Sequence, residues 1–200
     1  MLPLVLLFPS LAAAQSGKAP VSVLVMGDSL SAAYGMSIRQ GWAALFEQRL
    51  QRERPGSRVT NASISGETTQ GGLTRLPAEL DRARPDIVIL QLGANDGLRG
   101  QPVEAMRDNL LQMTRLSQRA GARVLILGMH IPPNYGPAYT TKFHQAFADV
   151  AKQTRSGHVP FFLDGIALDP QLIQADGLHP TASAQPKLLE TVWRALQPQL

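Results

Sequence analysis

Short apolar runs alternate with segments of helical periodicity along the chain, and this alternation restricts the possible fold more than any other feature. The runs predicted as strands are residues 21–26, 58–62, 86–92, 123–127 and 159–163. Helices are predicted at about 42–50, 73–82, 102–120, 140–153 and 185–196. Uninterrupted apolar strands are typical of a sheet that is covered on both faces. We therefore predict an α/β protein, a three-layer α/β/α sandwich built on a five-stranded parallel sheet.

The sequence has no internal repeat and no long linker, so residues 15–200 are predicted to form one domain. Residues 1–14, MLPLVLLFPSLAAA, are apolar and end in three alanines, which is typical of a signal-peptidase site. This segment is too short to span a bilayer as a helix, and it lacks the usual basic residue. A buried N-terminal strand is the alternative. We expect an export signal, and hence a periplasmic or secreted protein.

Composition excludes several kinds of chemistry. The chain has no cysteine, so disulfides, thiolate metal sites and cysteine nucleophiles are ruled out. The net charge is +4, but Lys and Arg are scattered among acidic residues, which favours a solvated surface over a nucleic-acid site. There is no glycine-rich nucleotide motif, and His130, His144 and His158 lack metal-ligand spacing. We expect no cofactor, no metal and no nucleic-acid partner.

Small and polar residues follow four of the five predicted strands. Ligands of a parallel sheet gather at the carboxyl ends of its strands, so these segments are candidate site loops. They are residues 27–30 (GDSL), 61–68 (NASISGET), 93–97 (GANDG) and 176–180 (DGLHP).

The residue types in these loops fit acyl transfer. A serine such as Ser29 attacks only when a base removes its proton, and His179 is a candidate base. Asp176, three residues earlier, is close enough to orient that imidazole. The backbone N–H of Gly66 and the side-chain amide of Asn95 are candidate donors to an oxyanion. Taken singly, each residue is more often a helix cap, a turn former or an ordinary loop residue, and only their shared position favours catalysis.

These blocks, in this order, resemble the SGNH (GDSL-type) hydrolases over nearly the whole chain from residue 21 onward. Residues 61–68, 95–100 and 133–136 are similar to the periplasmic thioesterase I/lysophospholipase and arylesterase branch. The resemblance implies a flavodoxin-like sheet, with Ser29 as nucleophile, His179 as base and Asp176 as its orienting carboxylate. It also implies an oxyanion hole formed by the backbone N–H groups of Ser29 and Gly66 and by the side chain of Asn95.

We therefore expect a cofactor-independent serine esterase, acting on acyl thioesters, lysophospholipids or aryl esters with apolar acyl chains. Asp28 is expected to have a structural hydrogen-bonding role. A carbohydrate O-deacetylase using the same site is the alternative enzyme, and a non-enzymatic flavodoxin-like binding module is the alternative from another class. We expect a monomer that makes transient contact with lipid surfaces. The residues expected to form the acyl groove, unless their loop only covers the sheet edge, are Leu98, Ile131, Pro132, Pro133 and Tyr135.

Overall fold

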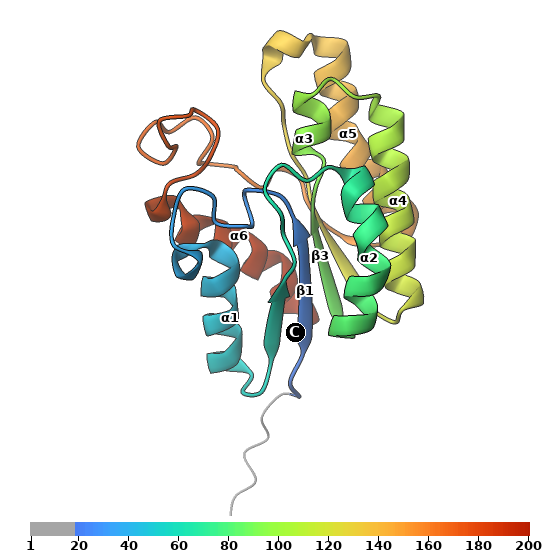
Figure 1. Ribbon diagram of the computed structural model, residues 1–200, viewed down its shortest axis with the longest axis vertical. Coiled ribbons are helices and arrows are strands. Elements are labelled where there is room, and N and C mark those ends of the chain that lie inside the picture. Colours follow the sequence, from blue (N-terminus) through green and yellow to red (C-terminus); the bar gives the residue numbers. More distant parts are fainter. Residues whose placement is uncertain (1–18) are drawn as a thin grey trace, which may run out of the picture.

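Residues 19–200 are described by a computed structural model, and they contain a five-stranded sheet (Figure 1). The predicted export signal, residues 1–14, lies outside the described residues. The strands are β1 (Ser22–Gly27), β2 (Arg58–Asn61), β3 (Ile87–Gln91), β4 (Arg123–Leu127) and β5 (Gly157–Val159). All neighbours pair in parallel, in the order β2-β1-β3-β4-β5, so the predicted α/β class and sheet are confirmed. Successive strands are added toward one edge from β1 to β2 and toward the other edge from β3 onward, so the strand order switches between β1 and β3, where parallel sheets open a crevice for ligands.

Helices cover both faces of the sheet. Figure 1 shows α1 (Trp42–Glu53) and α6 (Gln185–Leu196) on one face, and α2 (Thr69–Ala83) and α4 (Val103–Arg119) on the other. Helix α5 (Pro137–Thr154) packs beside α4. The shorter elements are α3 (Ala94–Leu98) and the 3-10 turns η1 (Ile38–Gln40), η2 (Pro133–Tyr135), η3 (Ala182–Ala184) and η4 (Gln197–Gln199). Within residues 19–200, no helix is both long and apolar enough to cross a membrane.

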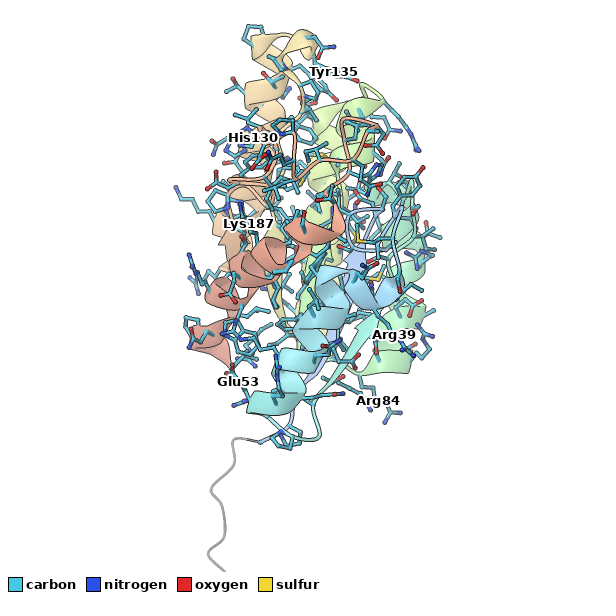
Figure 2. All side chains as sticks on the ribbon, turned by 90° about the vertical axis from the view of Figure 1, so that its left-hand side faces the viewer. Arg39, Glu53, Arg84, His130, Tyr135 and Lys187 are labelled. Atoms are coloured by element: carbon cyan, nitrogen blue, oxygen red, sulfur yellow. The ribbon has the colours of Figure 1, made fainter. Side chains whose placement is uncertain are left out.

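The core lies between the sheet and its helices. Strands β1 and β3 are buried along their whole length, as their uninterrupted apolar sequences predict. Trp42, Phe46 and Leu50 form the buried stripe of α1, and Trp42 packs edge-on against Phe162. In Figure 2, Glu53 and Arg84 lie toward the end of the molecule where strands begin. Tyr135 and His130 lie toward the other end, where the candidate loops gather.

The last strand differs from its prediction. It runs from Gly157 to Val159 instead of 159–163, and its last bond to β4 is the one that the Gly128 N–H donates to the Val159 carbonyl at 2.8 Å. The chain then bends across β4, and the N–H of Phe162 donates to the Gly128 carbonyl at 2.8 Å. Residues 160–181 contain no helix or strand apart from one isolated bridge between Ile173 and Pro180. The prediction was therefore wrong for residues 160–163, which belong to a long loop.

Candidate active site

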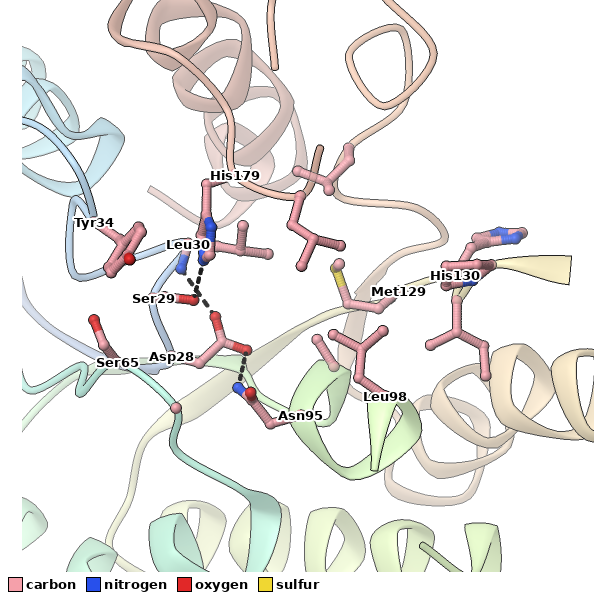
Figure 3. A pocket seen from close by; sticks show the side chains of 16 residues that line it. Asp28, Ser29, Leu30, Tyr34, Ser65, Asn95, Leu98, Met129, His130 and His179 are labelled. Carbon is pink, nitrogen blue, oxygen red and sulfur yellow. Dashed lines mark hydrogen bonds between the residues drawn. The ribbon is translucent and has the colours of Figure 1, made fainter. Parts of the chain in front are cut away.

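Ser29 lies in the turn that follows β1, at the carboxyl edge of the sheet. Gly27, just before this turn, lets the backbone pass close to neighbouring side chains. A Cβ at Gly27 would stand only 2.7 Å from Ser31 Oγ and 2.8 Å from Gln91 Oε1. Ser29 Oγ lies 2.8 Å from His179 Nε2 (Figure 3). On the other side of the ring, His179 Nδ1 lies 2.6 Å from Asp176 Oδ2. The structure thus brings together the serine, histidine and aspartate that the sequence predicted as a group.

Asp176 is prepared to orient the imidazole. Its Oδ1 accepts hydrogen bonds from the backbone N–H groups of His179 at 3.0 Å and Leu178 at 2.9 Å. These bonds, followed by the bond to the His179 ring, lower the pKa of the Asp176 carboxyl to about 2. The carboxylate is therefore ionised at neutral pH, and a carboxylate beside Nδ1 favours the tautomer with its proton on that nitrogen. Nε2 is then free to accept the proton of the Ser29 hydroxyl.

Three candidate oxyanion donors belong to residues that line the cavity beside Ser29 Oγ. They are the backbone N–H of Ser29, the backbone N–H of Gly66 and the side-chain amide of Asn95. Among residues 19–200, neither backbone N–H group has a hydrogen-bond acceptor. Gly66 has φ +78°, a conformation that favours glycine, and Arg99 donates to its carbonyl at 3.0 Å. Asn95, at the start of α3, donates to the Glu67 carbonyl at 3.0 Å and to Asp28 Oδ2 at 3.4 Å.

Asp28 is a buried carboxylate behind these donors. Its Oδ1 accepts from the Leu30 N–H and from Gln91 Nε2, both at 3.0 Å. Gln91 Oε1 in turn accepts from the Ser31 hydroxyl at 2.6 Å, which fixes the amide orientation. Burial raises the pKa of the Asp28 carboxyl from 3.8 to about 6, although the bonds from Leu30 and Gln91 oppose this. Gln91 was missed by the sequence analysis, and the signal for it was a polar residue at the end of an otherwise apolar strand.

Replacing Asp28 by asparagine is expected to change how stability depends on pH. The folded wild type binds the Asp28 proton more tightly than the unfolded chain does, so its free energy of unfolding falls as pH rises from about 4 to 6. The Asp28→Asn protein lacks this fall. Between about pH 4 and pH 6, the unfolding free energy of the wild type should therefore fall by about 2–3 kcal/mol relative to that of Asp28→Asn. Urea unfolding at several pH values measures it, and a difference that does not vary with pH would contradict the raised pKa.

The cavity beside Ser29 has a volume of about 290 Å³. Of the five residues expected in an acyl groove, Leu98, Ile131 and Pro132 line it. Pro133 and Tyr135 are not among the lining residues, and the Tyr135 hydroxyl instead donates to the Leu98 carbonyl at 2.6 Å. The apolar or aromatic lining residues that the sequence analysis missed are Leu30, Tyr34, Ala94, Met129, Leu163 and Leu178.

These omissions have identifiable causes. Met129 and His130 come directly after β4, whereas the predicted acyl groove begins in the same loop only at Ile131. Leu163 falls within the predicted fifth strand, whereas the observed strand ends at Val159. The His130 ring contacts the His144 ring, with 3.8 Å between the centroids and the planes inclined by 37°. Burial lowers the pKa of His130, and the nearby His144 lowers it further. Among the described residues 19–200, no group of three potential ligands is arranged to hold a metal ion.

Comparisons with known proteins agree on one family. Residues 25–185 match the model of the GDSL-like Lipase/Acylhydrolase family. Esterase TesA of Pseudomonas aeruginosa is 49% identical over 179 residues, covering 90% of this chain and 89% of that protein. Arylesterase of Vibrio mimicus is 41% identical, covering 98% and 96%. Thioesterase 1/protease 1/lysophospholipase L1 of Escherichia coli is 40% identical, covering 88% and 84%.

The fold is also similar to solved structures. A crystal structure of TesA superimposes with a TM-score of 0.86 at 49% identity, covering 89% of this chain and 99% of that one.

Proposed function

The chain belongs to the GDSL-like lipase/acylhydrolase family, and on that premise we propose that it hydrolyses esters and thioesters of apolar acyl groups through Ser29, His179 and Asp176. Membership confirms the resemblance read from the sequence, and it makes the chain a hydrolase rather than a binding module. The observation that carries the proposed mechanism is the 2.8 Å contact between Ser29 Oγ and His179 Nε2 at the wall of a largely apolar cavity.

In the proposed reaction, Ser29 Oγ attacks the substrate carbonyl while His179 Nε2 takes the hydroxyl proton. The ionised Asp176 stabilises the imidazolium that forms. As the tetrahedral intermediate collapses, His179 gives its proton to the leaving alcohol or thiol, and the acyl group stays on Ser29. Water, activated by the same imidazole, then attacks the acyl-enzyme and releases the carboxylic acid.

The negative oxygen of each tetrahedral intermediate needs donors that are already in place. The N–H groups of Ser29 and Gly66 are available, since neither bonds to another described residue. The Asn95 amide is held by the Glu67 carbonyl at 3.0 Å, whereas its 3.4 Å contact with Asp28 is long for a hydrogen bond. The Asn95 N–H that points to Asp28 is therefore the one we assign to the oxyanion. An oxyanion close to this N–H is a better acceptor than the distant carboxylate oxygen of Asp28.

The cavity lining supports an apolar acyl substrate. Leucine, isoleucine and methionine side chains surround the space next to Ser29. The relatives are named esterase, arylesterase and thioesterase/lysophospholipase, which supports small-molecule esters and thioesters as the substrate class. A carbohydrate O-deacetylase, the alternative enzyme, would not hydrolyse esters faster when the acyl chain is longer than acetyl. Export to the periplasm or beyond stays part of the proposal, supported by the apolar segment 1–14, and monomeric state and lipid contact stay predictions.

Acyl-chain length separates these alternatives. With p-nitrophenyl acetate, butyrate and octanoate, kcat/KM is expected to rise at least about tenfold from acetate to octanoate, since each buried methylene contributes about 0.8 kcal/mol. Leu178→Ser, which makes the cavity lining more polar, should reduce the octanoate rate more than the acetate rate. Leu168→Ser is the matched control, because Leu168 is 98% exposed and does not line this cavity. A preference of the wild type for acetate would favour the deacetylase.

A further inference from the structure

Gln174 connects the loop that carries Ser29 with the loop that carries His179. Its backbone N–H donates to the His179 carbonyl at 2.7 Å, which closes the turn containing Asp176. Its side-chain Nε2 donates to the Pro180 carbonyl at 2.9 Å and, across the gap between the loops, to the Tyr34 carbonyl at 2.9 Å. The Tyr34 N–H in turn donates to the Ser29 carbonyl at 3.2 Å. One glutamine thus links the backbones on both sides of the Ser29–His179 contact.

The sequence beside Tyr34 is adapted to this link. Gly35 has φ +74°, which favours glycine. A Cβ at this position would also collide with Gln174 Oε1. Moving the amide would relieve the collision but would take Nε2 away from the Tyr34 carbonyl. Glycine therefore permits both the local backbone conformation and the close approach of the two loops.

The Tyr34 ring lies against the imidazole of His179. The ring centroids are 4.3 Å apart and the planes are inclined by 33° (Figure 3). Tyr34 is 49% exposed, so burial of its own surface does not explain its position. Asp176 and Ser29 contact the edge of the imidazole, whereas Tyr34 covers one face. An aromatic face next to an imidazole stabilises the cation that forms when the ring takes up a proton.

This link matters because the sheet alone does not fix the His179 loop. Ser29 follows β1 directly, but His179 is 150 residues away, in a segment that contains no regular helix or strand between Val159 and Ala182. Small displacements of a catalytic group from its productive geometry can lower rates by about 10²-fold.

We propose that Gln174 is a positioning residue for catalysis, which holds the Tyr34 loop and the His179 loop together and keeps the Tyr34 ring on the imidazole. The inference rests on the proposed function of Ser29 and His179. Gln174 contacts no reacting atom, so its removal should affect turnover while leaving substrate binding in the apolar cavity largely unchanged.

The test uses the whole protein and p-nitrophenyl octanoate. Gln174→Leu removes the amide donors at similar size, and Gln174→Glu replaces the Nε2 donor by an acceptor. Both are expected to lower kcat by about 10- to 100-fold with KM within about twofold of the wild type. Gln171→Leu is the matched control, since Gln171 lies in the same loop and, among residues 19–200, its backbone N–H alone makes a hydrogen bond. It should retain wild-type kcat.

Two further variants keep the outcome decisive. Tyr34→Leu, which removes the aromatic ring from the face of the imidazole, should lower kcat by about 5- to 30-fold. Gly35→Ala should reproduce the loss of Gln174→Leu, and the double variant should be no slower than the slower single one. Wild-type kcat in either folded Gln174 variant would overturn the proposal. So would Gln171→Leu if it lowered kcat and the melting temperature as much as Gln174→Leu does. If instead Ser29→Ala stays active, it is the proposed function that fails.

Discussion

Replacing Ser29 by alanine is expected to lower kcat/KM on p-nitrophenyl octanoate by about 10⁴-fold or more, the scale seen when a catalytic triad loses its nucleophile. The reason is that no acyl-enzyme can form without the hydroxyl that lies 2.8 Å from His179 Nε2. The residual rate should come from the donors and the cavity, which still bind the substrate. Ser29 is on a turn outside the core, so the melting temperature should change little.

A fluorophosphonate probe gives a second readout of the same serine. It should label the wild type stoichiometrically and leave Ser29→Ala unlabelled. Ser65→Ala is the matched control, because Ser65 lines the same cavity but bonds to no histidine within the described part of the chain, where His179 Nε2 contacts Ser29 Oγ. That protein should keep both labelling and turnover. Near-wild-type hydrolysis by Ser29→Ala would remove the assignment of the nucleophile.

Replacing Asn95 by alanine is expected to lower kcat by about 10²–10³-fold, the usual effect of losing one oxyanion donor. The change should fall on kcat rather than KM, because the amide contacts the substrate oxygen most strongly once it is negative. Asn95→Asp keeps the size but presents acceptors to the oxyanion, so it should be at least as slow.

A control separates this effect from a general loosening of α3. Asp96, the neighbour of Asn95, anchors α3 by accepting from the N–H of Thr69 at 2.9 Å and from its hydroxyl at 2.5 Å. Asn109 donates to that hydroxyl at 3.1 Å from α4. Asn109→Ala therefore disturbs the anchor without touching the cavity, and it should reduce kcat only slightly. Equal losses in Asn95→Ala and Asn109→Ala would mean that Asn95 only shapes the turn.

The elements that the sequence predicted well are those whose burial has a simple period. The runs at β1 and β3 are apolar without interruption because both faces of each strand are covered. Helix α1 has an apolar stripe at Trp42, Phe46 and Leu50 because only one of its faces is buried. The candidate site loops could be predicted from the same pattern, since the exits of parallel strands share one edge of the sheet.

Prediction failed where the structure depends on a contact between distant segments. The fifth strand is predicted at 159–163 but lies at Gly157–Val159, because the apolar residues after Pro160 belong to a loop that is itself partly buried. Leu163 and Met129 look like ordinary core residues, and only the folded loops show that they border the cavity.

By itself, the sequence determined the α/β class, the order of strands and helices, and the set of residue types available for acyl transfer. Those properties follow from local periodicity and from chemistry that each residue carries alone. Only the tertiary structure decided which hydroxyl meets which imidazole, that Gln91 holds Asp28, and that Gln174 joins the Tyr34 and His179 loops. Such contacts join residues far apart in the chain, and their distances are set by how the whole sheet and its loops pack.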